Sequence, residues 1–141
     1  ATLYRYATLN LRELKQNLKI DTVQAVKGFV KAFLLSMPTG KQNTFANRTV
    51  PNFAYITFRQ DQPVNFAGAF EKPVYTRKEG YAEKSIQVFE AFVKKTYEAF
   101  VDAPNEAYCI GEKGTELGTE VSLQEFLEVV EKRISEYCEG E

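Results

Sequence analysis

The chain has 141 residues, 44% of them hydrophobic and 26% charged, which is the balance of a globular domain and excludes a disordered segment. No stretch approaches the ~20 apolar residues of a membrane span, and no charged-then-apolar leader opens the sequence, so we expect a cytoplasmic protein. Histidine is absent and Cys109 and Cys138 are isolated, so a histidine general base and the usual zinc ligand sets are excluded. We expect both thiols to be reduced and buried, and the start at Ala1 indicates a fragment.

The net charge of −1 conceals two oppositely charged segments. Residues 1–78 contain twelve basic and four acidic residues, whereas residues 79–141 contain six basic and fifteen acidic residues. A basic segment is typical of a phosphate binder, and an acidic one indicates a solubilising surface or a face complementary to a basic subunit. We therefore predict a basic part, 1–78, and an acidic helical tail, 79–141, that packs on it.

The pattern of the first 38 residues predicts a strand followed by two helices. Residues 2–11 alternate between apolar and polar side chains, which predicts a strand. Its tyrosines form either a stacking platform or, as we favour, a face that packs on a neighbouring element. A short helix over 12–18 precedes a longer amphipathic helix, which begins at a capping box of Asp21 and Gln24 and ends at Pro38.

Residues 36–52 form a long connection without a predicted helix or strand, and such connections are usually functional or disordered. From 39 to 52 this connection has no acidic residue but supplies cations, amides and one aromatic ring. This set suits a sugar-phosphate backbone, because cations neutralise phosphates and a ring stacks on a base. A solvated loop whose asparagines serve turn geometry is the alternative. The candidate nucleic-acid-binding residues are Lys41, Gln42, Asn43, Thr44, Phe45, Asn47 and Arg48, together with Arg5.

The remaining elements alternate strands and helices. Residues 53–60 predict a strand, and 64–70 are a possible hairpin partner for it. Ser85 is the predicted cap of a helix that continues to 100, and 107–110 predict a short strand. The glycines that follow indicate a flexible connection. Ser122 and Glu125 form a capping box that opens the last helix.

We find no catalytic motif. The glutamates on the polar face of the last helix are typical of solvation, and the glycine and hydroxyl pattern of a phosphate-binding loop is absent. We therefore interpret the chain as a binding protein without cofactor or metal. The order strand, helix, strand in its first half is half of a ferredoxin-like fold, so we predict an α+β class with a partial ferredoxin-like palm and additional carboxy-terminal helices. Further strands would have to come from another segment or another molecule.

Three stretches together resemble one family: YRYATLNLRELKQNL (4–18), MPTGKQNTFANRTVP (37–51) and DQPVNFAGAFEKPV (61–74). In this order and spacing they are similar to the carboxy-terminal part of the CasC-type backbone subunits of type I-E CRISPR Cascade complexes, of the RAMP superfamily. Members of that family are more than twice this length. The resemblance implies an RNA-recognition-motif-like palm that belongs to a ribonucleoprotein complex in antiviral defense.

The same resemblance implies a role and partners. Copies of such a subunit stack head to tail along a CRISPR guide RNA and present it for pairing with target DNA, without nuclease activity. The implied partners are the guide RNA, neighbouring copies, other Cascade proteins and, indirectly, target DNA, with no membrane. The alternative is a protein–protein interaction module, in which the loop and the two charged segments mediate subunit assembly without direct RNA contact.

Overall fold

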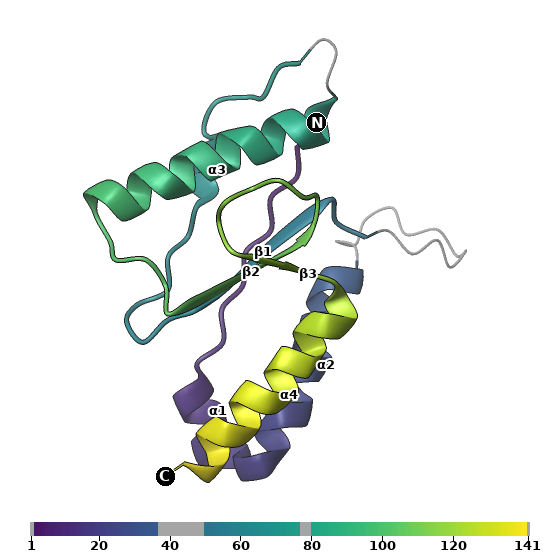
Figure 1. The fold of residues 1–141 in the computed structure, drawn as a ribbon, viewed down its shortest axis with the longest axis vertical. Coiled ribbons are helices and arrows are strands. Elements are labelled where there is room, and N and C mark those ends of the chain that lie inside the picture. The colour runs from purple at the N-terminus through teal and green to yellow at the C-terminus, as the bar shows by residue number, and fades with distance from the viewer. Residues whose placement is uncertain (1, 37–49, 77–79, 141) are drawn as a thin grey trace. The chain divides into compact units, whose positions relative to one another are not determined.

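The computed structural model describes residues 2–36, 50–76 and 80–140. Its elements are, in chain order, α1 (Leu11–Leu18), the 3-10 helix η1 (Lys19–Asp21), α2 (Thr22–Leu35), β1 (Phe53–Phe58), the 3-10 helix η2 (Ala67–Phe70), α3 (Tyr81–Ala99), β2 (Glu106–Gly111), β3 (Thr119–Val121) and α4 (Leu123–Glu139) (Figure 1). The predicted α+β class with carboxy-terminal helices is confirmed. The chain forms two compact units, one of residues 1–8 and 55–120 and the other of 9–54 and 121–141.

The first unit combines the sheet with α3. The strand order is β1-β2-β3, so the predicted strands at 53–60 and 107–110 are confirmed and are neighbours. The core of this unit is rich in aromatic rings. Phe66 and Phe89 lie at its centre, with ring centroids 5.8 Å apart in an edge-to-face geometry. Such pairs add to the free energy gained from the burial of apolar area. The helix α3 also contributes Val93, which is completely buried.

The predicted strand at 2–11 is wrong, because residues 2–10 have no regular structure and α1 begins at Leu11. Burial alternates only at the start of this segment, where Thr2 and Tyr4 are half-buried and the apolar Leu3 is 68% exposed. Thr2 Oγ1 lies 2.6 Å from Ser85 Oγ, and the Tyr4 hydroxyl accepts a hydrogen bond of 3.1 Å from the Phe66 amide. Side chains rather than a backbone ladder therefore hold this segment, and the packing role that we favoured for the tyrosines is correct for Tyr4.

Three local predictions need correction. The hairpin strand expected at 64–70 is replaced by η2 over its second half. The helix expected to begin at Ser85 begins at Tyr81, after Gly80 with its positive φ of 85°. The Ser85 hydroxyl does not cap the helix and lies buried against Thr2 Oγ1. Asp21 makes no side-chain capping bond, since its backbone is already helical, whereas an N-cap residue is normally extended.

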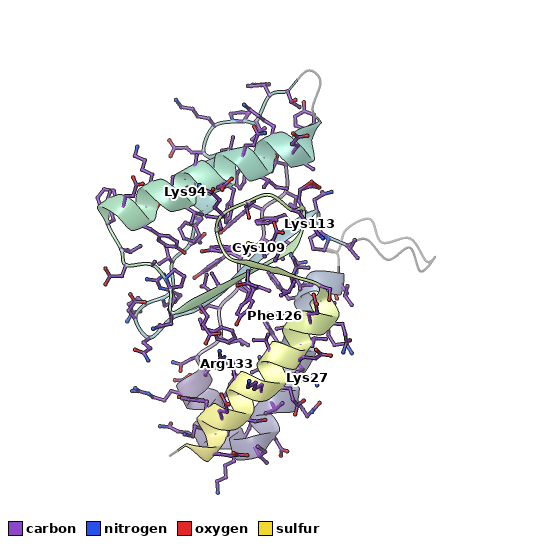
Figure 2. The ribbon with its side chains drawn as sticks, viewed as in Figure 1. Lys27, Lys94, Cys109, Lys113, Phe126 and Arg133 are labelled. Atoms are coloured by element: carbon purple, nitrogen blue, oxygen red, sulfur yellow. The ribbon has the colours of Figure 1, made fainter. Side chains whose placement is uncertain are left out.

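The second unit is built from α1, α2 and α4. The predicted capping box of α4 is confirmed: Ser122 Oγ accepts a hydrogen bond of 3.0 Å from the Glu125 amide, and the Glu125 carboxylate accepts one of 2.8 Å from the Ser122 amide. The apolar stripes of α2 and α4 face each other as their periodicity indicated. Phe126 of α4 (Figure 2) is 1% exposed and is among the core residues, which also include Val23, Val26, Leu127, Val130 and Ile134.

Candidate nucleic-acid interface

The predicted loop residues lie outside the described part of the chain: Lys41, Gln42, Asn43, Thr44, Phe45, Asn47 and Arg48. The described segments on either side of the loop are α2, with Ser36 after it, and β1, preceded by the exposed Val50. Arg5 is described, and its side chain is exposed in the extended segment of the first unit. The loop remains a predicted binding site.

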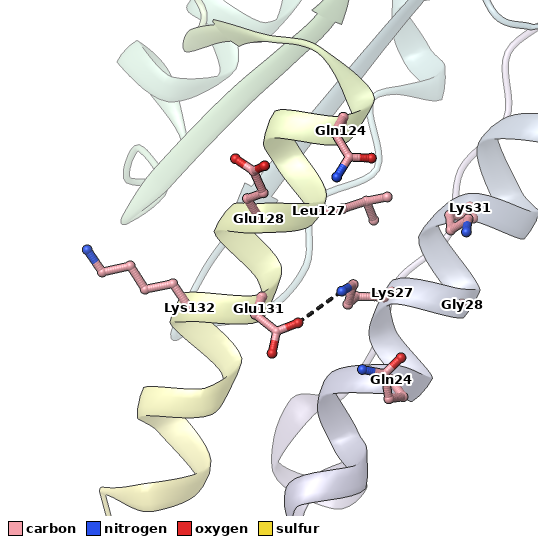
Figure 3. A pocket seen from close by; sticks show the side chains of 9 residues that line it. All are labelled: Gln24, Lys27, Gly28, Lys31, Gln124, Leu127, Glu128, Glu131 and Lys132. Carbon is pink, nitrogen blue, oxygen red and sulfur yellow. Dashed lines mark hydrogen bonds and ion pairs between the residues drawn. The ribbon is translucent and has the colours of Figure 1, made fainter.

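A groove lies between α2 and α4 in the second unit (Figure 3). Its volume is about 490 Å³. Four of its residues come from α2 at helical spacing and five come from α4; they are Gln24, Lys27, Gly28 and Lys31, with Gln124, Leu127, Glu128, Glu131 and Lys132. Gln24, Lys27 and Lys31 recur at helical spacing and so share one face of α2. That this face forms a groove with α4 was not predicted.

The groove carries charges of both signs. Lys27 Nζ lies 2.9 Å from Glu131 Oε1, so an ion pair crosses from α2 to α4 (Figure 3). The Glu131 side chain is 54% exposed, and an ion pair with this much solvent contributes less than about 1 kcal/mol to stability. Gln124 and Lys31 lie toward one end of the groove and Gln24 toward the other, whereas Lys132 lies level with Glu131 and points away from α2 (Figure 3). Cations and carboxylates are therefore interspersed along the groove.

Gly28 is the least expected of the groove residues. It is exposed in the interior of α2, and a Cβ atom built on it would meet no atom within 4 Å. Its φ is not positive, so its backbone does not require glycine. A glycine at such a position destabilises a helix by roughly 0.5–1 kcal/mol relative to alanine. No described contact within the unit explains why this position lacks a side chain.

Arg59 forms its hydrogen bonds within the first unit. Its Nε donates a 2.7 Å hydrogen bond to Asp61 Oδ1, and its Nη2 donates to Asp61 Oδ2 and to the Asp102 carbonyl oxygen. The guanidinium carbon lies 5.9 Å from the ring centre of Tyr97, whose hydroxyl is 2.8 Å from that of Tyr55. Hydrogen bonding to Arg59 lowers the pKa of Asp61, and burial raises the pKa of Tyr55. Arg59 thus joins β1 to the α3–β2 connection, although the sequence had counted it in the basic segment.

Carboxylates order the connection between β2 and β3. Lys94 (Figure 2) pairs with Glu90 at 3.2 Å and with Glu116 at 2.8 Å, and its hydrogen bond to Glu116 lowers the pKa of that carboxyl. The Glu120 carboxylate accepts a hydrogen bond from the Gly114 amide.

In the parts of the chain that the structure describes, no cluster of histidine, cysteine, aspartate or glutamate is arranged to hold a metal ion. None of the described helices is long and apolar enough to cross a membrane.

Two solved structures are similar to most of this chain. A chain of a "CRISPR RNA-guided surveillance complex, pre-nicking" superimposes with a TM-score of 0.70 and 28% sequence identity, over 90% of this chain and 35% of that chain. A chain of a "CRISPR RNA-guided surveillance complex" superimposes with a TM-score of 0.72 and 26% identity, over 92% of this chain and 50% of that chain. The present chain therefore corresponds to less than two thirds of the length of either one.

These similarities and the α+β fold define a Cas protein of the Cascade type. The Cas_CT1975 family model, described as CT1975-like protein, matches residues 1–133, and the chain belongs to this family. No curated protein sequence matches the chain. The resemblance to Cascade proteins is confirmed at this level.

Proposed function

We propose that the chain is part of a CasC-type backbone subunit of a type I-E Cascade complex. In this role it binds a CRISPR guide RNA without catalysis, and copies stack head to tail along the RNA to present it for pairing with target DNA. The observation that carries the proposal is the similarity of at least 90% of the chain to chains of two RNA-guided surveillance complexes. The other partners are neighbouring copies and further Cascade proteins.

The loop between α2 and β1 is the proposed contact with the RNA. Lys41 and Arg48 supply two positive charges in a stretch without acidic residues, and Phe45 supplies a ring for stacking. Arg5, exposed in the first unit, is a further candidate contact. Contacts of this kind bind the sugar-phosphate backbone of the RNA, and the target sequence is read by base pairing with the guide. The basic segment 1–78 is proposed to face RNA, and the acidic segment 79–141 to face solvent or a neighbouring subunit.

Replacement of Lys41 and Arg48 by alanine in the full-length protein tests this proposal. The double variant should lose affinity for all guide sequences alike, and each lost phosphate contact should reduce the salt slope of binding by about one unit. Phe45→Ala should weaken binding by ~1–3 kcal/mol if a base stacks on the ring. Lys113→Ala, an exposed cation in the acidic segment, is the matched control. Unchanged affinity in the loop variants, or an equal loss in the control, would contradict the proposal.

A protein-interaction module without direct RNA contact is the second candidate. The groove between α2 and α4 favours it, because its lysines and glutamates suit a protein surface better than a polyanion. Under this alternative the loop variants would keep the affinity of one protomer for a short RNA, and cooperative filling of a long RNA would be lost.

A further inference from the structure

Three cations follow one another along α1 and the turn after it, in the second unit. Arg12 and Lys15 are three positions apart and share a face of the helix, and Lys19 is the C-cap, four positions further on. The row spans ~10 Å of helix axis. None of the three forms an ion pair with any of the described residues, and Arg12 and Lys19 are exposed. Such a row of like charges repels itself in the isolated protein.

The carboxy-terminal end of α4 lies beside this row (Figure 1). The ammonium nitrogen of Lys15 is 4.6 Å from the ring centre of Tyr137, which is 40% exposed, so a cation–π contact holds this lysine. Arg133 lies one turn before Tyr137 on the same face of α4 and adds a cation, which Glu136 approaches to 3.6 Å. Packing thus places a ring and a cation from the acidic segment next to the basic α1.

Lys19 occupies a backbone position that favours glycine. Its φ of 53° and ψ of −126° make it the one non-glycine residue with a positive φ in the described part of the chain. Its amide donates to the Lys15 carbonyl oxygen, and its own carbonyl oxygen accepts a 3.3 Å hydrogen bond from the Cys138 thiol. Both bonds use the backbone alone, so glycine would keep them without the strain. Strained residues of this kind cluster at functional sites.

We propose that the row of Arg12, Lys15 and Lys19 binds the phosphate backbone of the guide RNA. This inference rests on the proposed function and adds a second contact to that of the loop. The row precedes α2 and the loop follows it, so a helix of ~20 Å separates the two contacts along the chain. Phosphates follow one another along a strand as these cations do along α1, and neutralise charges that have no acidic partner in the protein.

Arg12→Gln combined with Lys19→Gly in the full-length protein tests this contact, because glycine suits the backbone at position 19 and the fold is preserved. Lys95→Gln with Lys113→Gln is the matched control, since it removes two exposed cations of the first unit. Fluorescence anisotropy measures the affinity for a short single-stranded RNA over a range of salt. We expect weaker binding and a log–log salt slope smaller by about 1.4, at ~0.7 per phosphate contact. The control should keep the wild-type affinity and slope.

Wild-type affinity and slope in the double variant, or an equal loss in the control, would overturn the contact. Unchanged affinity for a short RNA with lost cooperative loading of a long one would overturn it too, because the row would then bind a neighbouring copy. Lys19→Gly alone should raise the melting temperature, and a lower one would show that this side chain serves the fold. Failure of the wild-type protein to bind RNA would instead refute the proposed function, and this contact with it.

Discussion

Substitution of Gly28 by alanine should stabilise the protein. The position is in the interior of α2, is exposed, has no positive φ and offers open space to a Cβ atom. Contacts are therefore unchanged, and the remaining effect is the smaller conformational entropy of alanine in the unfolded chain. Together with the helix preference for alanine this gives about 0.5–1 kcal/mol of added stability. The melting temperature should rise by about 2–4 °C per kcal/mol for a chain of this size.

Gly80→Ala is the matched control, because a Cβ atom there also meets no atom within 4 Å. Gly80 has a φ of 85°, which L side chains rarely adopt, so the same substitution should destabilise by roughly 1–3 kcal/mol. Urea and thermal unfolding followed by circular dichroism measure both variants. A Gly28→Ala variant no more stable than wild type would refute the conclusion that no described contact requires glycine at this position.

Two further predictions concern the core and the thiols. Phe126→Ala should destabilise by about 3–5 kcal/mol, because its side chain is 1% exposed in the core of the second unit, and urea unfolding that shifts by less than 1 kcal/mol would contradict the described packing. In the folded protein a thiol reagent should modify Cys138 well before Cys109, since Cys109 is buried and burial raises its pKa, whereas Cys138 is only half-buried. Mass spectrometry of partially labelled protein measures the order, and equal rates would show that Cys109 is accessible.

The amphipathic helices and the capping box at Ser122 could be predicted because their signals are local. Period and capping chemistry are contained within one turn or a few turns of chain. The segment before α1 shows the limit of this reasoning. Alternation shows which side chains share a face, as Thr2 and Tyr4 do, but the apolar Leu3 of the opposite face is 68% exposed. Alternation also does not reveal whether a second strand is present to form a ladder.

Contacts between residues far apart in the chain could not be predicted from the sequence. The groove depends on Lys27 and Glu131, which are 104 positions apart and meet only after α2 packs on α4. Strand β3 was missed because Gly118 was read as part of a flexible connection. A Cβ atom on Gly118 would lie 2.6 Å from the Ala107 carbonyl oxygen, so glycine allows the chain to approach the residues of β2 closely.

The salt dependence of RNA affinity tests the central claim most directly. The affinity of the full-length protein for a guide RNA and for a scrambled RNA of equal length would be measured by fluorescence anisotropy from low to physiological salt. A subunit that binds the phosphate backbone should bind both RNAs alike, and its affinity should fall steeply, with a log–log slope near the number of phosphates neutralised. A flat response to salt, or a strong preference for the guide sequence, would contradict the account.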